Sequence, residues 1–141
     1  MIRDFTENDI EAVMKLWLEG NLSAHDFIPA EYWEKNYASV RAAILSAEVL
    51  VYEHDGKIAG FIGLSGDYIA GIFVSEKFRS KGIGKALLDA AKKIHPVLWL
   101  HVYVQNAAAV SFYLREGFRI TDETVDESTG EREFCMKFVS F

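Results

Sequence analysis

Residues 79–85 combine glycines with basic side chains where a predicted strand gives way to a predicted helix. Gly82 and Gly84 would let the main chain approach a ligand closely, because a glycine has no Cβ. The first amide N–H groups of a helix have no partner within it and carry the positive end of its dipole. Arg79, Lys81 and Lys85 add positive charge there. The segment is therefore predicted to bind an anion, most suitably a diphosphate.

Two glycines at this spacing also occur in turns where they serve backbone geometry alone. The segment matches neither the GxxxxGK(S/T) phosphate loop nor the GxGxxG dinucleotide fingerprint. Both readings therefore stay open on this segment alone.

A second candidate segment begins at Asn106, which is placed to cap a helix at the end of a predicted strand. Ala109, Phe112 and Tyr113 follow at positions i, i+3 and i+4 and therefore lie on one helix face. A small residue beside two aromatic rings forms a slot for a narrow ligand arm. Gly117 is placed to end the helix.

Together the two segments resemble the motifs of the GCN5-related N-acetyltransferase (GNAT) family. Its coenzyme A motif, Q/R-x-x-G-x-G/A, is matched by Arg79, Gly82 and Gly84. Its second motif, N-x-x-A-x-x-F-Y-x-x-x-G-F, is matched by Asn106, Ala109, Phe112, Tyr113, Gly117 and Phe118. The likeness covers essentially the whole chain, and residues 25–33 are similar to a group of small bacterial members.

The resemblance implies an enzyme that transfers the acetyl group of acetyl-CoA to an amine and needs no metal. Acetyl-CoA would lie in a V-shaped opening between the strands that end at Val74 and Val104. The pantetheine arm would be held by backbone groups of Ile72, Phe73 and Val74, and the thioester end lined by Asn106, Ala109 and Phe112. The pyrophosphate would be held by Arg79 and the amides of Ser80, Lys81, Gly82, Ile83, Gly84 and Lys85.

Acetyl transfer to an amine needs a base for the ammonium proton and an acid for the departing thiolate. The resemblance implies direct transfer in a ternary complex, with Tyr113 as the acid; a packed tyrosine with a satisfied hydroxyl is the alternative. Cys135 is interpreted as a buried structural thiol rather than a nucleophile.

The base is less directly indicated. Many family members carry a carboxylate on the strand before the glycine turn, but residues 68–72 contain none. Members similar to the ribosomal-protein alanine acetyltransferases have a Glu at the position that His101 occupies here. Imidazole can accept a proton at neutral pH. We predict that His101 is the base or heads a water relay; a satisfied structural histidine fits the sequence equally well.

The loop between the first two helices is predicted to shape the acceptor pocket, as it usually does in the family. The candidates are His25, Phe27, Tyr32, Trp33 and, from the strand of His101, Tyr103. Packing of a helix stripe is the alternative for any single aromatic. The remaining histidines, His54 and His95, are predicted to be surface residues.

The 141 residues suit a single domain, and 50% are hydrophobic, as expected of a folded globular protein. No apolar run is long enough for a membrane span, and the N-terminus does not resemble a signal peptide. The single cysteine excludes an internal disulfide. These features predict a cytoplasmic protein.

The formal net charge of −6 repels nucleic acid and attracts protonated amines. It argues against an enzyme that acetylates aminoacyl-tRNA, which would need a basic surface. A sensor that binds acetyl-CoA without turnover is a further alternative, against which the retained Tyr113 argues. The acceptor amine could belong to a small molecule or a peptide, and the chain could be a monomer or a homodimer.

Hydrophobic periodicity places helices near 10–20, 30–46, 83–94 and 107–116. Strands are predicted at 2–5, 49–52, 58–64, 68–74, 97–104, 118–125 and 134–139, with a break over 21–28. This order predicts a mixed α/β (α+β) fold. We expect the GNAT fold, with a single mostly antiparallel sheet of about seven strands and helices on both faces.

Overall fold

The computed structural model describes residues 1–140. Its helices are α1 (Ile10–Ala24), α2 (Ala30–Ser46), α3 (Ile83–Ile94) and α4 (Ala107–Arg115). Its strands are β1 (Ile2–Asp4), β2 (Glu48–His54), β3 (Lys57–Ser65), β4 (Tyr68–Val74), β5 (Val97–Tyr103), β6 (Arg119–Asp126) and β7 (Glu131–Val139). Short 3-10 turns at Glu7–Asp9 and Glu76–Phe78 precede α1 and α3.

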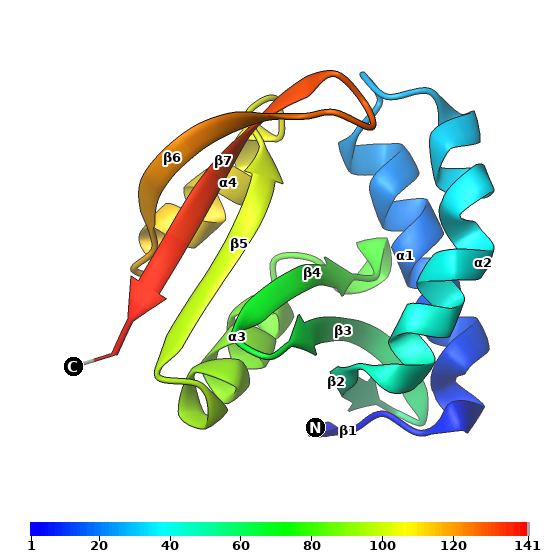
Figure 1. The fold of residues 1–141 in the computed structure, drawn as a ribbon. Helices are drawn as coiled ribbons and strands as arrows, with labels where there is room; N and C mark the ends of the chain where they lie inside the picture. Colours follow the sequence, from blue (N-terminus) through cyan, green and yellow to red (C-terminus); the bar gives the residue numbers. More distant parts are fainter. Residues whose placement is uncertain (141) are drawn as a thin grey trace.

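The strands form one 7-stranded sheet in the order β1-β2-β3-β4-β5-β7-β6. Every neighbouring pair is antiparallel except β4 and β5, which are parallel. Helices α1 and α2 lie on one side of the β1–β4 half, and α3 and α4 lie behind the sheet (Figure 1). The predicted mixed sheet with helices on both faces is therefore confirmed.

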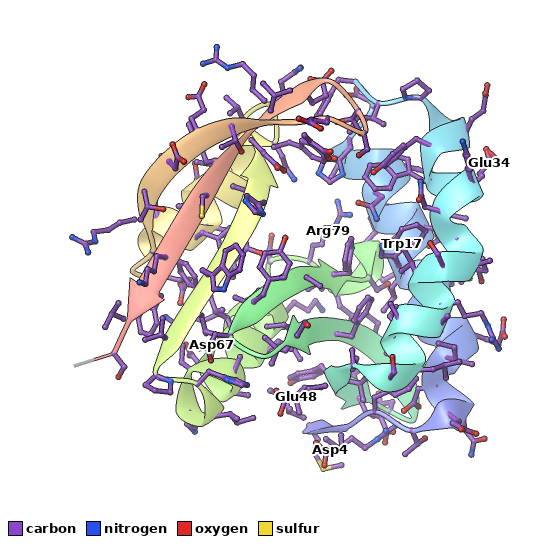
Figure 2. All side chains as sticks on the ribbon, viewed as in Figure 1. Asp4, Trp17, Glu34, Glu48, Asp67 and Arg79 are labelled. Atoms are coloured by element: carbon purple, nitrogen blue, oxygen red, sulfur yellow. The ribbon has the colours of Figure 1, made fainter. Side chains whose placement is uncertain are left out.

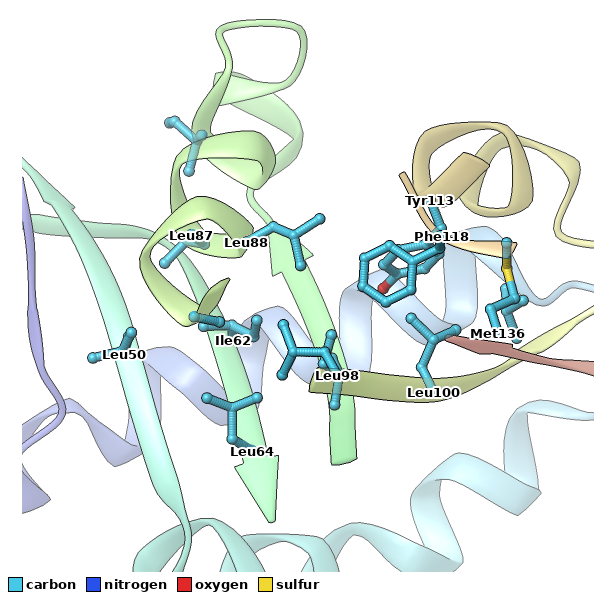
Figure 3. Packing of buried hydrophobic residues seen from close by; sticks show 14 of the residues in the cluster. Leu50, Ile62, Leu64, Leu87, Leu88, Leu98, Leu100, Tyr113, Phe118 and Met136 are labelled. Carbon is cyan, nitrogen blue, oxygen red and sulfur yellow. The ribbon is translucent and has the colours of Figure 1, made fainter. Parts of the chain in front are cut away.

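Strand alternation divides the core into two clusters, one on each face of the sheet. Val49, Val51 and Phe61 pack against α1 and α2, whereas Leu50 and Ile62 face α3. Figure 3 shows the cluster on the α3 side, in which Leu87 and Leu88 of α3 approach Ile62 and Leu98. Tyr113 and Phe118 continue this cluster over Leu100 and Met136. Both halves of the sheet are thus anchored to helices by buried apolar side chains.

The sheet opens in its middle, between β4 and β5. These strands are registered only where Tyr68 lies opposite Trp99, and beyond that point they diverge toward their carboxyl ends (Figure 1). The V-shaped opening predicted between these two strands is therefore present.

Helix α1 continues to Ala24, so the break predicted over 21–28 was wrong for its first four residues. The Asn21 side chain bonds the Trp17 carbonyl (2.9 Å), and the His25 amide closes the helix on the Asn21 carbonyl (2.9 Å). Strand β7 begins at Glu131 instead of 134, because Glu131 pairs with Asp126 next to the turn. The other predicted elements are present with small shifts at their ends.

Among the helices of residues 1–140, none has the length and apolar character needed to cross a membrane.

Candidate active site

The turn before α3 presents a row of free backbone donors. Within α3 the first amide with a backbone acceptor is that of Ala86, which donates to the Gly82 carbonyl at 2.9 Å. Within the described residues, the amides of residues 80–85 form no hydrogen bond. Ser80 and Gly82 adopt positive φ angles of 64° and 79°, which turn consecutive N–H groups toward one side. The local geometry is that of an anion site at a helix N-terminus.

Of the basic side chains around this turn, one lines the cleft and another forms ion pairs outside it. Arg79 lines the cleft described below, but the Lys85 ammonium lies 3.2 Å from Asp89 and 3.1 Å from Glu116. The predicted contribution of Lys85 to ligand binding is therefore reduced to its backbone amide. Gly84 faces Phe112 and Val74, each 3.7 Å from where its Cβ would stand.

A cleft of about 790 Å³ occupies the opening between β4 and β5. Its walls come mainly from α1, β4, β5 and α4, with single residues from α2, α3, β6 and β7. Two residues of the cleft wall are labelled in Figure 2: Trp17 on α1, and Arg79 after the carboxyl end of β4. The predicted residues that it brings together are His25, Trp33, Ile72, Phe73, Val74, Arg79, Gly84, His101, Tyr103, Asn106, Ala109, Phe112 and Tyr113.

Tyr113 is 8% exposed and lies between Phe112 and Phe118, with ring centroids at 5.2 and 5.4 Å. Tyr113 lines the cleft, and its hydroxyl makes no hydrogen bond to any group of residues 1–140. Burial raises the pKa of Tyr113 well above its usual value, and nearby Tyr68 adds to this shift. The phenol is therefore protonated at neutral pH and can donate a proton in the cleft.

His101 projects from β5 on the face that the helices leave open. Its Nδ1 lies 3.3 Å from the hydroxyl of Tyr68, and its ring packs edge-on against Trp99 at 5.5 Å. Tyr68 was not predicted as a site residue; the register of β4 and β5 places it opposite Trp99, from where its hydroxyl reaches His101. The imidazole remains solvent-accessible, so it can exchange protons.

His25 links α1 to α4 through two asparagine side chains. Its Nδ1 is 3.0 Å from Asn21 Oδ1, and its Nε2 is 3.0 Å from Asn106 Nδ2. Asn106 also caps α4, because its Oδ1 accepts from the Ala109 amide at 3.3 Å. The imidazole stacks on Trp33, with ring centroids 5.4 Å apart. His25 therefore spans one end of the cleft.

The other predicted acceptor residues divide into two groups. Tyr103 and Phe27 pack edge-on against His25, at 5.0 and 5.7 Å, although Phe27 is not part of the cleft wall. Tyr32 packs against Trp33 but points its hydroxyl at Ser128 on the β6–β7 turn, 2.9 Å away. Tyr32 therefore holds that turn rather than lining the cleft.

Two carboxylates of the cleft were not predicted from the sequence. Asp126 accepts a hydrogen bond from the Tyr103 hydroxyl at 2.7 Å, and Glu133 lies opposite Tyr103 on β7. Only the β5–β7 register reveals this proximity, because the sequence separates these residues from His101 by a helix and a turn.

Two other predictions need correction. His95 was expected at the surface, but its side chain is 17% exposed and lies between Glu48 (2.7 Å) and Asp67 (3.1 Å). Figure 2 shows Asp67 just before the start of β4 and Glu48 at the start of β2. Cys135 is half-buried, opposite His101 on the open face, rather than part of the core. His54 is exposed, as predicted.

Nowhere in residues 1–140 do three His, Cys, Asp or Glu side chains come close enough together to hold a metal ion.

Comparison with known proteins places this geometry in a family. Residues 46–120 match the family model of the acetyltransferase (GNAT) domain. The chain is 41% identical over 124 residues to the peptidyl-lysine N-acetyltransferase YiaC of Escherichia coli, covering 86% of this chain and 85% of that protein. It is 31% identical over 132 residues to the peptidyl-lysine N-acetyltransferase YjaB of the same organism, covering 92% and 89%.

The fold agrees with a solved structure of the same group. The apo form of Escherichia coli YjaB superposes with a TM-score of 0.86 and 28% identity, over 100% of this chain and 98% of that one. The chain therefore belongs to the GCN5-related N-acetyltransferase family and is an N-acetyltransferase that uses acetyl-CoA.

Proposed function

We propose that this enzyme acetylates the ε-amino group of lysine side chains in peptides or proteins. Relatives named peptidyl-lysine N-acetyltransferases, at 41% and 31% identity, support this acceptor class. The observation that carries the proposal is that the turn with the free amides of residues 80–85 borders, through Arg79 and Gly84, the cleft that Tyr113 also lines. Such a cleft can hold a diphosphate at one end and protonate a leaving group at the other.

In the proposed complex, the diphosphate of acetyl-CoA accepts hydrogen bonds from the amides of residues 80–85, with Arg79 beside it. The pantetheine arm lies along Ile72, Phe73 and Val74, where β4 has separated from β5. Asn106, Ala109 and Phe112 line the arm near the thioester. The backbone supplies most of these donors, so side-chain changes around the turn matter less than changes in its conformation.

The reaction is assigned to two titratable groups of the cleft, His101 and Tyr113. His101 takes a proton from the acceptor ammonium, directly or through a water, and frees the nitrogen lone pair. The nitrogen attacks the thioester carbonyl and forms the C–N bond, and its second proton then leaves to water. The C–S bond breaks and sulfur keeps the electron pair. Tyr113 donates its proton to the sulfur, and solvent restores the protonation states of both residues. No acyl-enzyme is formed, and Cys135 takes no part.

The single cysteine and the net charge of −6 support a reducing compartment, the cytoplasm, and an acceptor other than nucleic acid. The donor position of Tyr113 favours turnover over a sensor that only binds acetyl-CoA.

A turnover screen tests the proposal. Release of coenzyme A from acetyl-CoA is followed with lysine peptides, peptides that carry only an N-terminal amine, polyamines, aminoglycosides and free amino acids. We expect the highest kcat/KM with lysine peptides and a product acetylated on Nε by mass spectrometry. Preference for another amine would overturn the lysine assignment. Absence of calorimetric binding of coenzyme A would overturn the cofactor site.

A further inference from the structure

Glu133 is a carboxylate of the cleft with no partner in the described part of the chain. It lines the cleft, and no hydrogen bond or ion pair to its side chain is formed within residues 1–140. The other carboxylate of the wall, Asp126, is occupied by the Tyr103 hydroxyl (2.7 Å) and by the Ser128 hydroxyl and amide (2.6 and 3.0 Å). Of these two acidic side chains, only Glu133 is free to bind a ligand.

The position of Glu133 follows from the sheet register. In the antiparallel β5–β7 pair, Tyr103 lies opposite Glu133 and His101 lies opposite Cys135. Cross-strand partners project from the same face of a sheet, so Glu133 lies diagonally from His101. This is the face opposite the buried side chains Leu100, Val102 and Met136. Glu133 therefore projects toward the space in which the acceptor must approach His101.

The surroundings of Glu133 contain aromatic groups and a second carboxylate but no lysine or arginine partner. Titratable groups near it are Tyr68 on β4, His101 and Tyr103 on β5, and Asp126 at the end of β6. Lys137, the next lysine on β7, lies opposite Trp99, two residue pairs beyond His101. Burial raises the pKa of the Glu133 carboxyl; the interaction with His101 opposes this shift in part, and the charge of Asp126 adds to it. Partial burial of an unpaired carboxylate costs free energy, because the charge loses contact with water. A bound cation would offset this cost.

We propose that Glu133 is the ammonium-binding subsite for the acceptor, and that it selects protonated primary amines. This inference rests on the proposed acetyltransferase site but does not depend on lysine being the acceptor. The ammonium would form a charge-assisted hydrogen bond with the carboxylate, while the rings of Tyr68 and Tyr103 contact its alkyl stem. The ammonium proton then passes to His101 as described above, so Glu133 determines acceptor affinity and His101 determines the rate of the chemical step.

The test compares Glu133→Gln with a matched control, Glu127→Gln. The control removes the same charge from the same hairpin, at an exposed turn position outside the cleft. Glu133→Gln is expected to raise the KM of a lysine peptide by about tenfold or more, as for the loss of a hydrogen bond between charged groups. The KM of acetyl-CoA and the calorimetric affinity for coenzyme A should stay within about twofold.

An uncharged acceptor sharpens the test. The aminooxy analogue of the lysine peptide is nucleophilic but unprotonated at neutral pH, so Glu133→Gln should leave its KM nearly unchanged. Equal loss for the charged and uncharged acceptors would overturn the proposal, and so would an equal loss in Glu127→Gln. A denaturation midpoint close to that of the wild type will show that the variant is folded.

The outcomes also separate this inference from the acceptor assignment. If the wild type prefers a polyamine and Glu133→Gln raises the polyamine KM, the lysine assignment fails and the subsite stands. If lysine peptides are the preferred acceptors and their KM does not change, the subsite fails and the proposed function stands. Should no amine be turned over, n-butylammonium is titrated into the coenzyme A-saturated protein. Weaker binding to Glu133→Gln supports the subsite, and equal binding overturns it.

Discussion

Asn106 and His25 lie 81 residues apart in the chain and are joined by a hydrogen bond of 3.0 Å. The direction of this bond follows from the two asparagines that flank the imidazole. Asn106 uses its Oδ1 to cap α4, so it must donate to His25 through Nδ2. Asn21 donates from Nδ2 to the Trp17 carbonyl, so its Oδ1 must accept from His25 Nδ1. His25 is therefore neutral, with its proton on Nδ1.

Replacing His25 tests whether this bridge positions Asn106. His25→Ala leaves the Asn106 amide free to rotate and should lower kcat/KM about tenfold, the loss expected for a partly buried hydrogen bond. His25→Gln can accept from Asn106 and donate to Asn21, so it should retain most of the activity. Steady-state kinetics of the three proteins decide the matter, and equal activity of the alanine and glutamine variants would contradict a positioning role.

The same bridge predicts a loss of stability in acid. Burial lowers the pKa of His25 to about 4, below its value of 6.5 in the unfolded chain. Between these values the unfolded chain binds the proton and the native protein does not, so stability falls as pH decreases from 6.5 toward 4. Urea denaturation midpoints across this range should fall more steeply for the wild type than for His25→Gln. Parallel curves would rule out this linkage.

His95 should act in the opposite sense. Its hydrogen bond to Glu48 raises its pKa above 6.5, with a further contribution from Asp67. The native protein therefore holds the proton more tightly than the unfolded chain. This stabilisation is complete below pH 6.5 and disappears as pH rises through the native pKa. His95→Gln should lower the denaturation midpoint at pH 6 and have little effect at pH 9. An equal loss at both values would show that the ion pairs do not contribute.

Tyr113→Phe tests the proposed acid. The ring is packed against Phe112 and Phe118, so its phenylalanine counterpart should fold and bind coenzyme A as the wild type does. Loss of the proton donor should reduce kcat by about 100-fold or more. Calorimetry and kinetics on the same preparation separate binding from turnover, and wild-type kcat in this variant would remove Tyr113 from the mechanism.

The two glycines of the turn should respond differently to alanine. Gly82 has φ 79° with open space around its missing Cβ, so Gly82→Ala strains the backbone by about 1 kcal/mol and should weaken coenzyme A binding. At Gly84 a Cβ would make ordinary contacts at 3.7 Å, so Gly84→Ala should bind coenzyme A with little change. Calorimetric titration of both variants provides the comparison, and equal weakening would show that space, rather than conformation, limits the turn.

The features that the sequence determined are local. Helix α3 has the predicted bounds because Gly82 starts it and His95 with Pro96 ends it. The free amides of residues 80–85 and the Asn106 cap likewise depend on residues within one turn of chain. Strand alternation placed His101 and Tyr103 on one face of β5. Backbone geometry and capping act over a few residues, so the order of residues is enough to predict them.

Only the tertiary structure decided which side chains meet. Glu133 faces the cleft because β7 pairs with β5 in a register that no short motif encodes, and a shift of one residue would turn it to the opposite face. The same applies to Tyr68 beside His101, and to Glu48 and Asp67 around His95. Register is fixed by the summed burial of side chains from distant elements. For that reason the proposed acid was visible in the sequence, whereas the carboxylate that faces the acceptor was not.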